Sequence, residues 1–344
     1  MKTPQNRSPE ASSKNDDSIS CRRQTLAGKI CCYAGSLLLL VLLISCGGGD
    51  IIASGGIGGT GSISIGTISA LGSIFVNGVE FDTSGASVDY NGSSGNPSLL
   101  QVGMVVTVEG TINQDGRTGV AKSVVYDNNL LGPISSIDQA NGSITVLGQH
   151  IFTDGQTVFA AGTAVSSQAE LHEGDIIEVS GLTNADGSIE ASRITLLAAA
   201  SVQEYQITGQ VSNVTAGTFQ INDLTIDYAQ AGQGMGRMSS PQDGQVVQAV
   251  GMLNSNNILV ATAMRKMGDY SGKKGQMLLS GFIRSAAADT FTISAPMGSL
   301  MVDVGQDTVF TGGTAADLVP GVLVQVKGGM SMGTVTAREI SISN

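Results

Sequence analysis

The sequence predicts an all-β protein made of four tandem units, each a small OB-like five-stranded barrel with little helix. Two observations support this prediction. A strand that ends in glycine recurs four times along the chain, and a strand led by alanine follows each one nine to eleven residues later. The glycines are Gly110, Gly181, Gly251 and Gly328, and the alanines are Ala121, Ala191, Ala261 and Ala337. Such self-similarity is typical of repeat architectures.

The second and fourth units show the order of elements most clearly. Each opens on a glycine, in GPISSID from Gly132 or GFIRSA from Gly281, and continues into a stretch that alternates apolar and polar residues. Alternation with a period of two indicates half-buried strands. Thr-Val-Phe follows at 157–159 and at 308–310, which predicts a short buried strand.

The second half of each unit begins with a polar stretch. SSQAELHEG ends at Gly174 and TAADLVPG ends at Gly321, and both are suited to one capped helical turn. The first unit has NPSLLQVG at this place and the third has SSPQDG. Turns such as NQDGRTG and NADGSIE then join the last two strands as hairpins. This order fits an OB-like barrel of roughly 60–70 residues, and a repeated β-sandwich or one elongated β-stack is the alternative.

The predicted boundaries follow from these patterns. The units span residues 63–128, 129–198, 205–267 and 276–344. The third is divergent, because its middle, AQAGQGMGRMSSPQDG, lacks the Thr-Val-Phe strand. Short connections occupy 198–204 and 267–276, and a glycine-rich stretch at 46–62 has the composition of a flexible tether.

The N-terminal segment predicts a bacterial lipoprotein. Residues 30–46 form an apolar run that is short for a membrane span but suits a signal peptide over 1–45. Leu43-Ile44-Ser45-Cys46 matches the lipobox, so we expect cleavage before Cys46 and its lipidation. The alternative is a plain membrane anchor with a chance cysteine. Arg22-Arg23 resembles a twin-arginine export signal, although the leucine-rich core favours general secretion. Gly47 after the cysteine favours the outer membrane.

Processing would leave a thiol-free and strongly acidic chain. The other three cysteines, Cys21, Cys31 and Cys32, lie in the leader. The leader also takes 6 of 17 basic and 3 of 28 acidic residues, which leaves 11 against 25 and a formal charge of −14. Such a charge disfavours nucleic acid and anionic membrane surfaces as partners.

The repeated pattern resembles a tandem domain of unknown function found in proteobacterial secreted lipoproteins. In the second unit the similar residues are ISSID, SITVLG, TVF, LHEGDIIEVSG and NADGSIEASRITL. The resemblance covers nearly all of 63–344 and is poorest in the third unit. It implies no assigned activity and no catalytic residues.

Residue patterns give no catalytic constellation. His150 and His172 stand apart, and we interpret both as surface or packing residues. Asp154, Asp175 and Asp307 are interpreted as turn-capping residues. Recurrent Asp-Gly pairs lack the spacing of a calcium loop and are assigned to hairpin turns. No cofactor is expected, and scattered tyrosines without any tryptophan disfavour sugar binding.

The methionines are unevenly distributed along the chain. Ten of the eleven in the mature chain follow residue 234, and close pairs could bind soft Cu(I) or Ag(I). The candidate ligands are Met235, Met238, Met264, Met267, Met330 and Met332, and gap-filling core methionines are the alternative. Our leading hypothesis is a non-enzymatic, outer-membrane-anchored lipoprotein that acts as a multivalent binding or assembly module for an envelope protein. Soft-metal binding is the alternative function.

Overall fold

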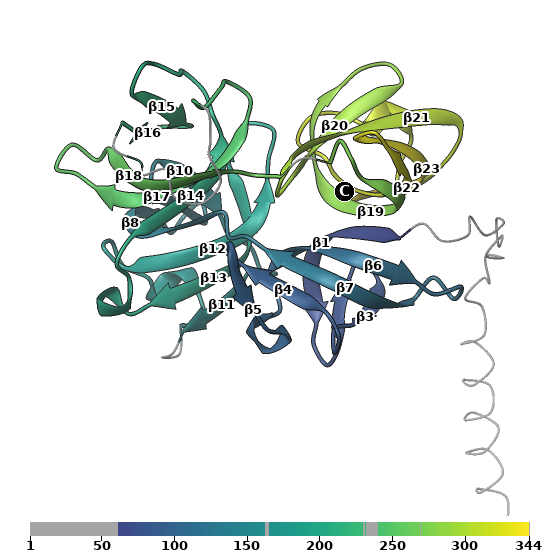
Figure 1. Cartoon of the computed structure of the whole chain (residues 1–344), viewed down its shortest axis with the longest axis horizontal. Helices are drawn as coiled ribbons and strands as arrows, with labels where there is room; N and C mark the ends of the chain where they lie inside the picture. Colours follow the sequence, from purple (N-terminus) through teal and green to yellow (C-terminus); the bar gives the residue numbers. More distant parts are fainter. Residues whose placement is uncertain (1–60, 162–164, 230, 232–239, 269, 344) are drawn as a thin grey trace, which may run out of the picture. The chain divides into compact units, whose positions relative to one another are not determined.

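The computed structural model describes residues 61–161, 165–229, 231, 240–268 and 270–343. The chain divides into two compact units, Met1–Gly55 and Gly56–Asn344, and all the described residues lie in the second. Within them, regular structure consists of strands β1 to β23 and four short 3₁₀ turns, with no α-helix (Figure 1). The predicted all-β class and the four tandem units are confirmed.

The second repeat shows how each barrel closes. Strand β8 pairs antiparallel with both β9 and β12, and β9 pairs antiparallel with β10. Strand β13 lies between β10 and β12; it pairs parallel with β10 and antiparallel with β12. The sheet therefore returns to its first strand, which is OB-like topology and excludes the sandwich and stack alternatives. The strands are β8 Leu130–Asp138, β9 Ser143–Val146, β10 Gln149–Phe152, β11 Val158–Ala161, β12 Ile176–Thr183 and β13 Ile189–Leu197.

The first and fourth repeats close in the same way. The first repeat contains β1 Ser62–Ala70, β2 Ile74–Val76, β3 Val79–Asp82, β4 Ser87–Tyr90, β5 Ser93–Gly95, β6 Val105–Ile112 and β7 Thr118–Tyr126. The fourth contains β19 Lys274–Ala286, β20 Thr290–Ala295, β21 Gly298–Thr311, β22 Leu323–Ser331 and β23 Thr334–Ser343. Strand β1 begins at Ser62, the last residue of the predicted tether.

The third repeat is the most open. Its strands are β14 Tyr205–Gln210, β15 Thr218–Ile221, β16 Leu224–Asp227, β17 Val246–Leu253 and β18 Leu259–Lys266. An isolated bridge between Ser212 and Gln220 supplies the contact that a full ladder makes between the first two strands elsewhere. The described residues between Asp227 and Val246 form no strand, and residues 230 and 232–239 lie outside the described part.

The recurrent glycine and alanine face each other across the last hairpin of every repeat. The pairs are Gly110–Ala121, Gly181–Ala191, Gly251–Ala261 and Gly328–Ala337. The register shifts immediately before each glycine, and a β-carbon on any of the four would lie under 3.0 Å from a carbonyl oxygen of the partner strand. The motif therefore marks a β-bulge at which the two backbones approach too closely for a side chain. Each partner strand begins two or three residues before its alanine.

A second glycine lies two residues before the fourth barrel strand of each repeat. These glycines have positive φ angles of 90°, 89°, 85° and 87° at Gly103, Gly174, Gly244 and Gly321. Each donates its N–H, at 2.8–2.9 Å, to a carbonyl of the first strand or, in the third repeat, to that of Val211 directly after this strand. Asp243-Gly244 thus belongs to this entry turn and not to a hairpin as predicted, whereas Asp115-Gly116 and Asp186-Gly187 do lie in hairpin turns.

Short 3₁₀ turns occupy the predicted helical positions in three repeats. They are η1 Pro97–Leu99, η2 Gln168–Glu170 and η4 Ala315–Asp317, and η3 Ala199–Ser201 lies in the connection at 198–204. Thr314 and Asp317 form a capping box on η4. In the third repeat, residues 240–244 form no helical turn.

The Thr-Val-Phe segments form strands, but they are not buried as predicted. Val158 and Phe159 in β11 are partly exposed, and Val309 in the second half of β21 is 59% exposed. Strand β11 pairs only with β13. Since it lies at the edge of the sheet, one of its flanks stays uncovered.

Neighbouring repeats share strands and cores. The N-terminal half of β1 pairs in parallel with β19, from Ser62–Gln276 to Ile65–Leu279 (Figure 1). Ile63 and Ile65 of β1 belong to the core of the fourth repeat, whereas Leu278 of β19 belongs to the core of the first. Side chains alternate along a strand, so each of these strands serves two barrels.

The second and third repeats are also fused. Strand β8 pairs with β14 through Leu130–Ile207 and Leu131–Gln206, and one hydrophobic core spans both repeats. The predicted connection at 267–276 is packed as well, because Met267 and Tyr270 are buried. The described repeats therefore form one body.

The bulge glycine generates a stability prediction. Gly181→Ala should lower the free energy of unfolding by about 1–3 kcal/mol, because the new methyl group would meet the Glu190 carbonyl. Gly155→Ala is the matched control, since nothing lies within 4 Å of its β-carbon position. Urea unfolding of the whole chain, followed by circular dichroism, measures both. Equal unfolding midpoints for the two variants would contradict this account of the motif.

Candidate functional site

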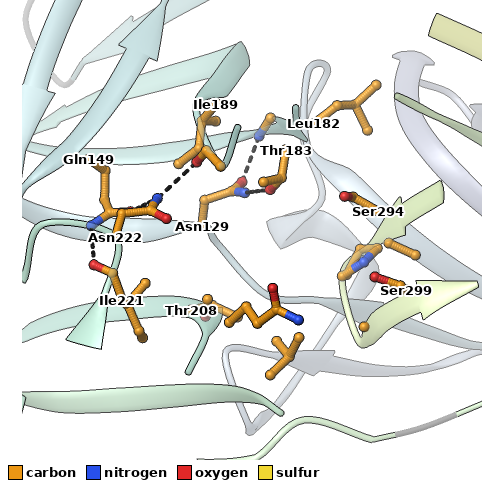
Figure 2. A pocket seen from close by; sticks show the side chains of 18 of the residues that line it. Asn129, Gln149, Leu182, Thr183, Ile189, Thr208, Ile221, Asn222, Ser294 and Ser299 are labelled. Atoms are coloured by element: carbon orange, nitrogen blue, oxygen red, sulfur yellow. Dashed lines mark hydrogen bonds between the residues drawn. The ribbon is translucent and has the colours of Figure 1, made fainter. Parts of the chain in front are cut away.

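A polar cavity of about 190 Å³ lies where residues of all four repeats meet. We call it the junction cavity. Figure 2 shows Gln149 and Asn222 on one side, Ser294 and Ser299 on the other, and Asn129 with Thr183 between them. Side chains that line it include Asn128, Asn129, Gln149, Thr208, Arg284 and Ser294. Apolar residues such as Leu182, Ile189 and Ile221 also line it, so the surface of the cavity is mixed.

Residues 127–129, between β7 and β8, connect three repeats at the cavity, and we call them the junction segment. Asn129 accepts a hydrogen bond from Gly181 N–H at 2.8 Å, and its carbonyl accepts one from Thr208 N–H at 2.8 Å. Asn128 accepts from Gln206 Nε2 at 2.7 Å. The segment between β7 and β8 is therefore fixed by hydrogen bonds to the second and third repeats.

The second and third repeats supply another part of the wall. Gln149 donates to the carbonyls of Leu147 and Ile221, at 3.0 Å each, and accepts from Asn222 Nδ2 at 2.7 Å (Figure 2). Gln149 is 3% exposed, and Asn222 is exposed at the turn between β15 and β16. This pair fixes the two barrels to each other and gives the cavity a polar, rigid side.

The fourth repeat contributes a cation and hydroxyl groups. Arg284 Nη2 donates to Gln210 Oε1, and Ser294 lies at the end of β20. Two buried polar atoms of the lining have no hydrogen-bond partner, Asn128 Nδ2 and Ser294 Oγ. Most buried polar groups in proteins are paired, and these two atoms are exceptions that the surrounding protein encloses.

A buried ion pair lies behind the cavity. Asp127 pairs with Arg265, which also donates from Nε to Gln248 Oε1 at 2.8 Å. The Asp127 side chain is 3% exposed. Burial raises the pKa of Asp127, and the nearby Arg265 guanidinium opposes this effect. Charge compensation by Arg265 lets Asp127 stay in the interface as a structural group.

A second polar cluster joins the first and second repeats. Tyr126 donates to Glu178 Oε1 at 2.8 Å, and the Tyr90 and Tyr126 rings lie 4.8 Å apart. Burial, with the charge of Glu178, raises the pKa of Tyr90 to about 12 and that of Tyr126 well above its ordinary value. Both phenols therefore remain protonated donors at neutral pH, which suits an interface contact.

The cavity is arranged for recognition through hydrogen bonds. Among the described residues that line it, only Asp127 and Asp186 carry carboxylates, and no histidine is present. Asp127 is paired, and Asp186 accepts from Ser188 N–H and Oγ in its turn. The Ser188 hydroxyl, then its backbone N–H, lowers the pKa of Asp186.

The residues singled out in the sequence lie away from this network. The side chain of His150 is 63% exposed and that of His172 is 80% exposed, in agreement with their interpretation as surface residues. Asp154 accepts from the N–H groups of Gln156 and Thr157, so it caps a turn as predicted. Asp175 likewise accepts from His172 N–H. Asp307 lies within the exposed second half of β21.

The candidate methionine ligands are placed in different surroundings. Met264 packs against the core shared by the second and third repeats, whereas Met330 belongs to the core of the fourth. Met267 is 2% exposed. Strand β22 ends at Ser331, and Met332 lies in the following turn, 78% exposed. Met235 and Met238 lie outside the described residues, so soft-metal binding stays a prediction.

The N-terminal predictions also fall outside the described residues. These are the signal peptide over 1–45, Cys46 and nearly all of the tether. Over the described ranges, no helix has the length and apolar character to cross a membrane.

Sequence reasoning missed the residues that build the junction cavity. Asn128, Arg284 and Ser294 come from three different places in the chain, and no local pattern connects them. One signal was present: Asp127-Asn128-Asn129 is a run of polar residues between two strands without the glycine that a free turn would favour.

Two aspartates whose pKa values are shifted in opposite directions give a prediction for the pH dependence of stability. Because the folded pKa of Asp127 is raised, its contribution to stability is present below the unfolded pKa and is lost as pH rises through the folded pKa. The unfolding free energy of the native chain, relative to Asp127→Asn, should therefore fall as pH rises above about 4, the ordinary pKa of an aspartate. The pKa of Asp115 is lowered by its hydrogen bond from Thr118 and by backbone N–H groups, so the native chain should gain stability relative to Asp115→Asn as pH rises toward about 4.

Urea unfolding at several pH values measures both differences. Two differences that change in the same direction would contradict the assignment of a desolvated carboxylate at Asp127.

Comparison with known proteins identifies the repeat. A domain described as a domain of unknown function (DUF5666) matches four times, at residues 64–125, 132–195, 208–265 and 280–341. No curated protein sequence matches the chain. Each match begins within the first strand of a repeat and ends within its last strand. With four matches that cover most of its length, the chain belongs to the DUF5666 family.

Proposed function

We propose that this protein is a non-enzymatic binding or assembly module, anchored to the bacterial outer membrane by lipid on Cys46. In this proposal the repeats bind a partner in the cell envelope and the lipid keeps them at the membrane. More than one acyl chain gives stable anchoring, whereas one chain alone would bind marginally.

The lining of the junction cavity is the observation that carries the binding role. Its polar groups are amides, hydroxyls and one guanidinium, and its two carboxylates are engaged in an ion pair and in a turn. Such groups orient a bound molecule by hydrogen bonds and supply no activated nucleophile.

The fusion of the repeats favours one composite binding body over four independent modules. Linked modules gain avidity when each can engage a separate site. Here β1 pairs with β19 and β8 pairs with β14, so the first repeat is joined to the fourth and the second to the third, and the repeats are not four independent domains while these ladders are intact. Partner recognition would then depend on surfaces that several repeats form together.

Anchoring is tested by lipid labelling in the bacterium that makes the protein. Cys46→Ala should lose the label from an alkyne fatty acid and move from the membrane to the soluble fraction, because the acceptor thiol is gone. Cys31→Ala is the matched control, since it removes a thiol of the same N-terminal stretch and should keep both label and location. Retention of the label by Cys46→Ala would refute the anchor.

Binding is tested by in-cell crosslinking with mass spectrometry on the native chain and on Cys46→Ala. One dominant envelope protein, captured only with the native chain, is the expected result. No reproducible crosslinked species, or identical species from both chains, would contradict an anchored assembly role.

A further inference from the structure

We propose that residues 309–311 of β21 bind an extended, apolar and basic segment of a partner protein as an additional antiparallel strand. We call these three residues the β21 edge. This inference rests on the proposed binding function, and it names the surface that binds and the kind of partner that the surface takes.

The strand that contains the β21 edge has an equivalent in two other repeats. It is β4 in the first repeat and β11 in the second, and each of the three pairs in parallel with the last strand of its own repeat. In every case the pairing begins two residues after the alanine of the bulge motif, at Ser87–Ser123, Val158–Arg193 and Val309–Glu339. The three strands therefore occupy the same position in their barrels.

The first repeat shows what this position accepts. Strand β5 returns along β4 as an antiparallel neighbour, with Val88 opposite Gly95 and Tyr90 opposite Ser93 (Figure 1). The turn between them is Asn91-Gly92, whose φ angles of 53° and 78° suit a tight hairpin. An added antiparallel strand is therefore an occupant that the chain itself places on this edge.

The fourth repeat lacks such a cover. Residues 91–96 separate β4 from η1 and include β5, whereas only residues 312–314 separate β21 from η4. A hairpin needs a turn of at least about two residues and then a return strand, so this short connection has no room for one. Among the described strands, β23 alone pairs with residues 309–311. The connection after β11 contains residues outside the described part, so the inference is confined to the fourth repeat.

The hydrogen bonds of the first repeat indicate which backbone groups the β21 edge offers. Asn91 N–H donates to the Tyr126 carbonyl of β7 at 2.8 Å, and alternate residues of a strand bond to the same neighbour. Val88 is an odd number of residues away, so its N–H and carbonyl point toward β5. Phe310 occupies the position of Val88, and its backbone groups therefore point away from β23, where a partner strand would bond to them.

The side chains of the β21 edge also differ from those of the covered strand. Val309 is 59% exposed, and the equivalent residue in the first repeat is the polar Ser87. Phe310 packs against the core of the fourth repeat, so its neighbours Val309 and Thr311 lie on the outer face. An apolar residue in the partner segment would cover Val309 from the neighbouring strand position.

The charges near the β21 edge favour a basic segment. Asp307 precedes the edge and Asp317 follows it, and both are exposed and form no ion pair with a described residue. Of the cations in β22 and β23, Lys327 is paired with Glu339, and Arg338 is exposed beside the edge. Because the mature chain also carries a formal charge of −14, it attracts lysine or arginine in a partner segment.

A second copy of the chain is the competing occupant, since two such edges could pair with each other. That pairing would bring two chains of formal charge −14 together, which like charges disfavour. A segment of a different protein is therefore the better match.

Fluorescence anisotropy with the mature chain tests the proposal. The probe is a labelled, blocked short peptide of alternating lysine and valine. A peptide of the same sequence with every backbone nitrogen methylated should bind at least about tenfold more weakly, because it has no N–H group to donate. A peptide of alternating glutamate and valine should also bind at least about tenfold more weakly, because its charge has the wrong sign.

Two valine variants locate the binding site. Val309→Lys should weaken binding of the lysine–valine peptide by about threefold or more, because an apolar contact is replaced by a like charge. Val120→Lys is the matched control: this valine is 50% exposed, but its strand, β7, has neighbours on both sides, so binding should be unchanged.

A third variant closes the edge. In it the sequence of residues 91–96 replaces residues 312–314, which supplies the turn and return strand of the first repeat. Binding should fall by at least about tenfold, because the added strand occupies the backbone groups of the edge. Circular dichroism and the urea unfolding midpoint show whether this variant folds, and if it does not, Val309→Lys and the methylated peptide decide the question.

Several results would overturn the inference. Absence of binding, or equal binding of the methylated and unmethylated peptides, would exclude strand addition, and equal binding of the glutamate peptide would exclude a basic partner. Native affinity in Val309→Lys or in the folded closed-edge variant would place the peptide elsewhere. A dimer in sedimentation that the closed-edge variant does not form would assign the edge to a second copy. None of these results affects lipid labelling at Cys46 or envelope crosslinking, so failure of this inference is distinguishable from failure of the proposed function.

Discussion

The structure depends on the pairing of two first strands, β1 of the first repeat and β19 of the fourth, each of which contributes side chains to both barrels. In β1, Ile63 and Ile65 enter the core of the fourth repeat while Ser62 to Thr67 pair with β6 of the first. In return, Leu278 of β19 enters the core of the first repeat. Because parallel pairing of β1 with β19 satisfies the backbone groups that two isolated barrels would leave at open edges, the beginning and end of the repeat array are held together.

The junction cavity is a consequence of this arrangement. Barrels have apolar interiors and polar exteriors, so the space where four of them meet is enclosed by their polar outer residues. The junction segment satisfies most of these groups, through Asn129 with Gly181 and Thr208, and leaves Asn128 Nδ2 unpaired. The cavity, which residues of all four repeats line, then exists only when the repeats are assembled.

The barrel could be predicted from the sequence because its constraints are local. A glycine and an alanine, such as Gly181 and Ala191, recur at a similar spacing in each repeat because they face each other at the same bulge. The alternation of apolar and polar residues along 143–152 identifies two paired strands. The pairing of repeats could not be predicted, because backbone edges have no side-chain signature and Ile63 and Ile65 show the same alternation whichever core they enter. Arg284 and Ser294 were equally hidden, since they line one cavity with Asn128, more than 150 residues earlier in the chain.

The pairing of β1 with β19 has a consequence for synthesis. The first repeat emerges before the fourth, so Ile63 and Ile65 have no core to enter until β19 arrives, more than 200 residues later. During that interval β1 presents an unpaired edge with exposed isoleucines, a state that is prone to aggregate. Contacts so distant in sequence also form slowly. The fold is therefore completed only after the whole chain has been made. A chain that lacks the fourth repeat would also lose the pairing and burial of β1 in the first repeat.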